Sequence, residues 1–288
     1  MEIFTLLSID CDLRIGNVHH RQNALDALIR LFEDHDIRGH VTWFLNENDF
    51  NIVEWHSTFL DEILEANESI GLHDHFDRID SIHYYYPEAT PVDIHSYEEV
   101  YFLLEHSKRI VENYLKSKGY DRPVVIHRNG CLVQSIAIYR ALKDLGYTVL
   151  SDIIPQAQID GFKYRDRIGR PHVMFNMGIP IGVQPYRHDV DNWTDFNSRE
   201  GHFIQIPVHY MGATLDFKCV EKTVEACLRS NVDQCVFSWL FHPYEIQNSD
   251  GSISEGKMRI VEDNINRLIK EYDSKFNSFD EILERLRL

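Results

Sequence analysis

Carboxylates, imidazoles and a guanidinium collect at four places along the chain, each directly after a run of apolar residues. The four places are Asp10-Cys11-Asp12, His73-Asp74-His75-Phe76-Asp77, His127-Arg128-Asn129-Gly130 and Phe241-His242-Pro243-Tyr244-Glu245. Aspartate and histidine act as general bases, general acids and metal ligands. Each group alone has an ordinary explanation, such as a turn or a helix cap. Because all four follow apolar runs, together they indicate one functional site.

The apolar runs predict the elements that position these groups. Seven of them are expected to form strands: residues 3–9, 40–45, 69–74, 123–127, 147–150, 203–208 and 235–241. Between them lie stretches with a helical period, clearest at 97–115, 217–228 and 258–272. Strands that alternate with helices form a parallel sheet or a β/α barrel, whose ligands bind at the carboxyl ends of the strands. The four polar groups all fall at such ends.

Two capping boxes mark helix starts. Ser96 with Glu99 precedes the helix expected over 97–115, and Ser278 with Glu281 predicts a short C-terminal helix. Two segments, 76–95 and 151–202, show no clear period, and loops this long often carry function or cover a site. There is no internal repeat or convincing linker, so we expect one domain over residues 1–288.

Composition narrows the class of protein. The chain of 288 residues has 29 Lys+Arg and 46 Asp+Glu, and 29 − 46 gives a formal charge of −17. This charge argues against nucleic acid or an anionic membrane as a partner. No apolar run approaches the roughly 20 residues of a membrane span. Five scattered Cys without a CxxC pair predict neither a disulfide framework nor a structural zinc site, and without a signal peptide we expect a cytoplasmic protein.

The order of these motifs resembles that of the NodB-homology polysaccharide deacetylases. That family has an Asp-rich motif after its first strand, then a His-x-x-x-His motif, an Arg-centred motif and a His near the last strand. The matching stretches here are Ser8–Asp12, Ile70–Asp77, His127–Gly130 and Leu240–Glu245. His40–Leu45, Gln205–Val208 and Phe279–Leu283 also resemble family elements, so the resemblance covers nearly the whole chain.

The resemblance implies a distorted (β/α)7 barrel that binds one divalent metal, usually zinc, and removes acetyl groups from N-acetylated sugars. Asp10 would be the general base, held in place by Arg128. Asp12 and His73 would be metal ligands, and His242 would be the general acid. These roles suit amide hydrolysis, which needs an activated water, a stabilised oxyanion and a proton for the leaving amine.

The chain departs from the family pattern at the third ligand. Asp77 stands where the second His of His-x-x-x-His is expected, and a carboxylate is an acceptable zinc ligand if the segment turns helical after His73. His75 is the competing choice, because it shares a face with His73 if the strand continues. We favour Asp77, with His75 close behind. Asp189 and Asp191 resemble the Asp that orients the acid His, although a plain turn explains them equally well.

Several functions remain open at this point. The alternatives are a metal-free cyclic amide or ureide hydrolase on the same barrel, a non-catalytic glycan-binding protein and an unrelated metal-dependent barrel hydrolase. Since no secretion signal is expected, we predict an intermediate of surface polysaccharide biosynthesis, such as O-antigen, as the substrate. Trp43 and the Tyr84–Tyr86 run could stack on sugars, but core or lid packing is the preferred interpretation. The sequence does not indicate the oligomeric state.

Overall fold

The computed structural model describes residues 1–76, 96–132, 134–155 and 178–286. Their strands form a single sheet in the order β6-β7-β5-β4-β3-β2-β1-β9-β8, with β10 paired to β1. All pairs are parallel except β6 with β7. The strands are β1 Glu2–Asp10, β2 Val41–Leu45, β3 Ser69–Asp74, β4 Ile126–Asn129, β5 Val149–Leu150, β6 Tyr186–His188, β7 Phe203–Gln205, β8 Tyr210–Met211, β9 Gln234–Phe241 and β10 Lys275–Phe276.

One stretch of chain joins the two sides of this sheet. Residues 203–211, which begin as β7 and end as β8, pair first with β5 and then with β9. Between these strands, Ile206 N–H donates to the carbonyl of Leu150 at 2.8 Å, and His209 N–H donates to the carbonyl of Ser238 at 3.0 Å. The sheet therefore curls into a distorted β/α barrel, as predicted.

The seven predicted strands correspond to β1, β2, β3, β4, β5, β7 and β9. The sequence missed β6, β8 and β10, which have two or three residues each and lie outside the predicted strands. It also placed the fourth strand too early, since β4 begins at Ile126 rather than at residue 123.

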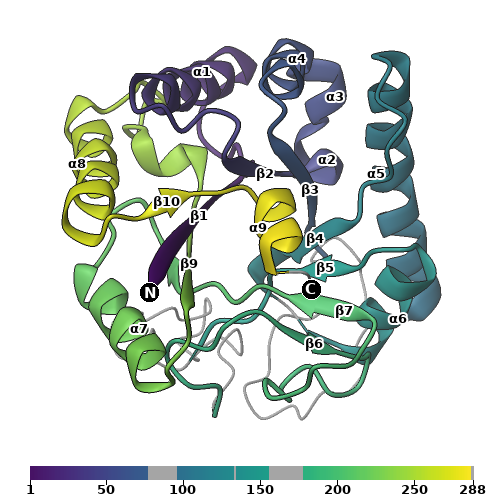
Figure 1. Cartoon of the computed structure of the whole chain (residues 1–288). Coiled ribbons are helices and arrows are strands. Elements are labelled where there is room, and N and C mark those ends of the chain that lie inside the picture. The colour runs from purple at the N-terminus through teal and green to yellow at the C-terminus, as the bar shows by residue number, and fades with distance from the viewer. Residues whose placement is uncertain (77–95, 133, 156–177, 287–288) are drawn as a thin grey trace, which may run out of the picture.

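Helices surround the sheet on its outer side, as Figure 1 shows. Those described are α1 Val18–Asp34, α2 Glu47–Phe50, α3 Ile52–Trp55, α4 Ser57–Glu65, α5 Tyr97–Ser117, α6 Ile136–Asp144, α7 Phe217–Arg229, α8 Glu255–Tyr272 and α9 Phe279–Leu286. Both predicted caps are present: the Ser96 side chain accepts from Glu99 N–H, and Ser278 and Glu281 bond each other's backbone N–H groups. None of the described helices combines the length and hydropathy needed to cross a bilayer.

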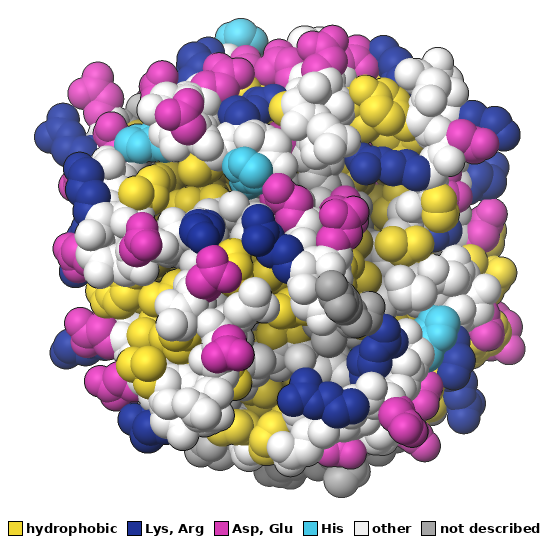
Figure 2. Space-filling model, viewed as in Figure 1, with side chains coloured by type: hydrophobic (Ala, Val, Ile, Leu, Met, Phe, Trp, Pro, Cys, Tyr) yellow, Lys and Arg dark blue, Asp and Glu magenta, His cyan; other side chains and the backbone are white. Residues whose placement is uncertain are grey.

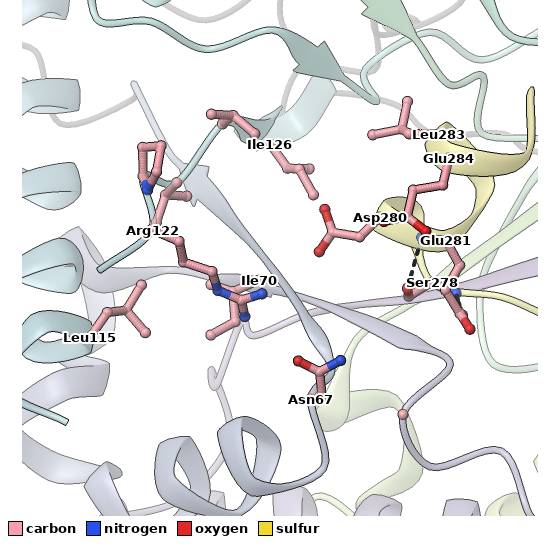
Figure 3. Close-up of a pocket in the computed structure, with 14 residues that line it drawn as sticks. Asn67, Ile70, Leu115, Arg122, Ile126, Ser278, Asp280, Glu281, Leu283 and Glu284 are labelled. Carbon is pink, nitrogen blue, oxygen red and sulfur yellow. Dashed lines mark hydrogen bonds between the residues drawn. The ribbon is translucent and has the colours of Figure 1, made fainter. Parts of the chain in front are cut away.

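Helix α9 closes the end of the barrel at which β1 begins (Figure 1). Phe279 and Ile282 of α9 pack inside the barrel against Phe4, Leu6 and Phe44. Figure 2 shows acidic and basic side chains interspersed over this face of the molecule. A pocket of about 490 Å³ lies beside α9 (Figure 3). Among the described residues, the group that could hold a metal ion does not line this pocket.

The residues of β1 explain why polar side chains lie at the end of the barrel opposite α9. Phe4 and Leu6 belong to the apolar cluster inside the barrel, whereas Leu7 and Ile9 belong to the cluster that includes the surrounding helices. Since side chains alternate along a strand, Asp10 shares the inward face with Phe4 and Leu6. The barrel interior is therefore apolar near α9 and polar at the carboxyl ends of the strands. All these strands belong to one sheet. That residues 1–288 form a single domain stays a prediction from the sequence.

Candidate active site

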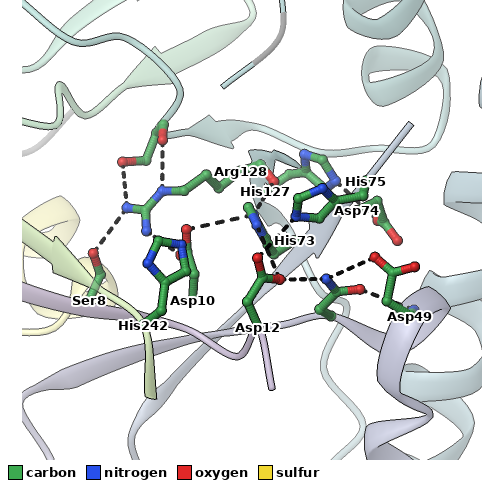
Figure 4. A network of polar contacts seen from close by, with 12 residues as sticks. Ser8, Asp10, Asp12, Asp49, His73, Asp74, His75, His127, Arg128 and His242 are labelled. Atoms are coloured by element: carbon green, nitrogen blue, oxygen red, sulfur yellow. Dashed lines mark hydrogen bonds and ion pairs between the residues drawn. The ribbon is translucent and has the colours of Figure 1, made fainter. Parts of the chain in front are cut away.

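Four strand ends bring the candidate residues together, as Figure 4 shows. Asp10 is the last residue of β1, and Asp12 follows two residues later. His73 lies in β3 and Arg128 in β4, where the register makes these two residues direct neighbours. His242 follows β9 and begins a 3-10 turn over Pro243–Ile246. Tertiary structure thus gathers residues that the sequence places more than 200 positions apart.

Arg128 holds Asp10 in a buried ion pair. Its Nη1 donates to Oδ1 of Asp10 at 2.6 Å, and neither residue is more than 1% exposed. The other two nitrogens are bonded too: Nε donates to the carbonyl of Ser151, and Nη2 donates to the hydroxyls of Ser8 and Ser151. The guanidinium also stacks over the Phe44 ring at 3.9 Å. This geometry fixes the position of the Asp10 carboxylate.

Asp12, His73 and His75 form the group of described residues that could hold a metal ion. One potential ligand atom from each lies within 4.8 Å of the others, and all three residues are buried. Nε2 of His73 is 3.8 Å from Oδ1 of Asp12, and Nε2 of His75 is 3.2 Å from Oδ2. One carboxylate and two imidazoles, with a position left for water or substrate, are a common zinc-hydrolase ligand set.

The surroundings of His73 fit metal binding. Its Nδ1 lies 3.1 Å from the backbone oxygen of Arg128, so Nδ1 carries the proton and Nε2 presents its lone pair toward Asp12. Metal-binding histidines usually donate their other N–H to such a partner. Burial also lowers the pKa of His73 to about 4, which keeps the imidazole neutral, as a ligand must be.

Asp12 is held ionised at the centre of this group. Burial would raise its pKa, but the hydrogen bond from His75 and the nearby imidazoles bring that pKa well below its usual value. Asn46 donates to Oδ1 at 2.7 Å, and Arg14 donates to Oδ2 at 2.8 Å. Asn46 is oriented by its role as N-cap of α2, where it accepts from the N–H of Asp49.

The end of β3 decides which side chains reach the site. His73 and His75, two residues apart, bring their rings to 4.9 Å. Asp74, between them, faces the opposite way and bonds His127 at 3.1 Å and Ser107 at 2.5 Å. His75 therefore reaches the same side as His73, although β3 ends at Asp74 and does not continue through His75. Asp77, the other predicted choice, lies outside the described residues.

A carboxylate that the sequence analysis did not select orients His242. Nδ1 of His242 lies 2.8 Å from Oε1 of Glu245, and the same oxygen accepts from the His242 N–H. The other oxygen of Glu245 accepts from Ala213 N–H at 2.8 Å. Burial would lower the pKa of His242, but Glu245 and the nearby Asp10 raise it above the ordinary value. An i, i+3 pair across a turn was the available signal for Glu245.

Other candidates from the sequence lie away from this site. Asp189 pairs with Lys143 at 3.3 Å in a surface turn, and Asp191 is exposed. Trp43 is completely buried and donates to Glu68 at 2.8 Å, as expected of a core residue. The Tyr84–Tyr86 run lies outside the described residues.

Comparisons with known proteins show which solved structures share the fold of this chain. No protein family model and no curated protein sequence matches the chain. A candidate polysaccharide deacetylase from Mycobacterium smegmatis superimposes with a TM-score of 0.59 and 13% identity, over 99% of this chain and 90% of that one. A 4-alpha-glucanotransferase from Thermococcus litoralis superimposes with a TM-score of 0.55 and 13% sequence identity. The match covers 99% of this chain and 40% of that one.

A third solved structure is a candidate polysaccharide deacetylase involved in O-antigen biosynthesis from Bordetella bronchiseptica. It gives a TM-score of 0.42 and 19% identity, over 98% of this chain and 90% of that one. At these identities the likeness concerns the fold, so the chain has a polysaccharide deacetylase-type barrel fold.

Proposed function

We propose that this protein is a metal-dependent hydrolase that removes an N-acetyl group from an amino sugar. One observation carries the proposal: a carboxylate fixed by a buried arginine, a metal-ligand set and a carboxylate-bound imidazole share one end of the barrel. The deacetylase-type barrel fold agrees with this activity.

Asp12, His73 and His75 would hold the metal, for which zinc is our choice. A zinc ion there supplies Lewis-acid polarisation of the acetyl carbonyl and a lowered pKa for its bound water. We now favour His75 over Asp77 as the third ligand, because His75 Nε2 already faces Asp12 at 3.2 Å.

The chain's own residues handle the protons. Asp10, held in place by Arg128, accepts a proton from the water whose oxygen bonds to the acetyl carbon. His242 donates a proton to the amide nitrogen as the C–N bond breaks, because an unprotonated amine is a poor leaving group. Glu245 keeps the proton on Nδ1, so that Nε2 is the atom that delivers a proton. The products are acetate and a free amino sugar.

The direct test is acetate release from N-acetylated sugars, sugar nucleotides and lipid-linked sugars, with protein loaded with zinc or cobalt. We expect turnover that a chelator abolishes and added metal restores. Asp10→Asn should bind metal yet release acetate about 10²-fold more slowly or worse. Absence of turnover on every substrate by metal-loaded protein would refute the proposal.

The same experiment separates the alternatives. Full activity of metal-free protein on a cyclic imide or ureide would establish the metal-free hydrolase instead. Glycan binding without hydrolysis would identify a binding protein. A cytoplasmic location and a role in surface polysaccharide biosynthesis, O-antigen included, stay predictions of the sequence.

A further inference from the structure

Arg14 is the cation that solvent reaches at the mouth of this site. Its Nη2 lies 2.8 Å from Oδ2 of Asp12, and 49% of its side chain is exposed. The other guanidinium at the cluster, that of Arg128, has no exposed surface and is bound on all three nitrogens. Among the residues that the structure describes, no other Lys or Arg forms an ion pair with Asp10 or Asp12.

Arg14 also connects the two halves of the proposed site. Its guanidinium carbon lies 5.9 Å from the centroid of the Tyr244 ring. That ring stacks on His242, with 4.8 Å between the ring centroids and 23° between the planes. A ligand group bound by Arg14 would therefore lie beside both the Asp12 cluster and the layer that contains the proposed general acid.

The chemistry of this position favours an anion. A guanidinium binds phosphate through two parallel hydrogen bonds, and this geometry makes arginine a preferred phosphate ligand. The formal charge of −17 repels anions in general, so an anionic substrate needs a local cation at the mouth. The Arg14 side chain is half exposed while Asp12 is buried, so an incoming anion can reach the Arg14 guanidinium from solvent.

We propose that Arg14 anchors a phosphate on the anomeric carbon of the substrate. The substrate class is then an N-acetylated amino sugar linked to a phosphate or diphosphate, rather than a neutral glycan. In a 2-acetamido sugar the acetamido group and the anomeric oxygen sit on adjacent carbons. With the acetyl group at the Asp12 cluster, the phosphate falls beside it, where Arg14 lies. This assignment rests on the deacetylase function proposed above.

The test compares kcat/KM for N-acetylglucosamine 1-phosphate with kcat/KM for N-acetylglucosamine. Wild-type protein should prefer the phosphate. Arg14→Gln should reduce this preference by about tenfold or more, as expected for loss of a hydrogen bond to a charged group. Glutamine can still donate to Asp12, and any effect on Asp12 itself is common to both substrates and cancels in the ratio. Arg14→Lys, which keeps the charge, should retain part of the preference.

Arg30→Gln provides the matched control, because Arg30 is an exposed residue of α1 and its change alters net charge equally. It should leave the preference unchanged. A nucleoside diphosphate sugar and a short polyprenyl diphosphate sugar, assayed in parallel, identify which source of the phosphate the protein uses. No preference in the wild type, or an equal preference in Arg14→Gln, would overturn the assignment of Arg14.

Binding of the nucleoside diphosphate sugar, measured by calorimetry, separates the proposal for Arg14 from the proposed deacetylase function. Acetate release that does not depend on Arg14 removes the anchor and leaves the deacetylase. Binding that Arg14→Gln weakens about tenfold, without acetate release from any substrate, supports the anchor and refutes the deacetylase.

Discussion

Nδ1 of His73 lies 3.1 Å from the backbone oxygen of Arg128, while the side chain of Arg128 reaches Asp10 at 2.6 Å. One residue of β4 thus orients both a metal-ligand candidate on β3 and the proposed base on β1. The parallel pairing of β3 with β4 sets the first contact through the backbone, so it does not depend on the type of side chain at position 128.

This arrangement predicts different outcomes at Asp10 and Arg128. Arg128→Met should lower the free energy of unfolding by about 3–5 kcal/mol, because it leaves a buried carboxylate without its partner. Asp10→Asn keeps a hydrogen-bond acceptor for Arg128 and should destabilise less. Thermal unfolding measures both changes. The control Arg30→Met removes an exposed guanidinium and should alter stability by less than about 0.5 kcal/mol. Equal losses in Arg128→Met and Arg30→Met would contradict the buried pair.

Metal content should depend on three residues. Asp12→Ala, His73→Ala and His75→Ala should each lose stoichiometric zinc, whereas His106→Ala, which changes an exposed histidine of α5, should retain it. Elemental analysis after dialysis provides the readout. Zinc at 100 times its Kd should also stabilise the wild type by about 2.7 kcal/mol.

Asp77→Asn decides between the two choices for the third ligand. We expect it to keep zinc while His75→Ala loses it. The reverse result would restore Asp77 as the ligand.

Glu245→Gln should shift the pH dependence of activity. Because Glu245 helps to raise the pKa of His242, its loss lowers that pKa. His242 must be protonated to act as an acid, so the alkaline limb of the kcat profile should move to lower pH, by about one unit. Asp189→Asn, the position that the sequence suggested, should leave the limb in place. A limb that stays fixed in Glu245→Gln would exclude Glu245 as the positioning residue.

Asp152 should make stability depend on pH. Burial raises the pKa of this fully buried carboxyl to about 7. From about pH 4 to 7 the Asp152 carboxyl has lost its proton in the unfolded chain but keeps it in the folded protein. The free energy of unfolding therefore falls across this window as pH rises, by up to about 4 kcal/mol.

Asp152→Asn removes that titration and should raise Tm at pH 8 relative to the wild type while flattening the change between pH 5 and 8. The control Asp191→Asn alters an exposed carboxylate and should not flatten it. An unchanged slope in Asp152→Asn would show that Asp152 does not titrate in this window.

Local pattern was informative where an element is long and buried. Strand β1 was predicted almost to its ends, because nine consecutive residues leave a clear apolar run. The C-terminal helix was located from Ser278 and Glu281, since a capping box needs only neighbouring residues. Strand β6 was missed, because three residues in a segment without a period produce no signal.

The sequence by itself determined that Asp10, Asp12, His73, His75, Arg128 and His242 lie at or just after the ends of buried strands, because neighbouring residues alone form the apolar runs that predict those strands. Only the tertiary structure decided which partners these side chains meet. The ion pair of Arg128 with Asp10, the approach of His73 to Asp12 and the contact of Asp74 with His127 depend on strand register. Those are set by contacts between residues far apart in the chain, and no local pattern contains them.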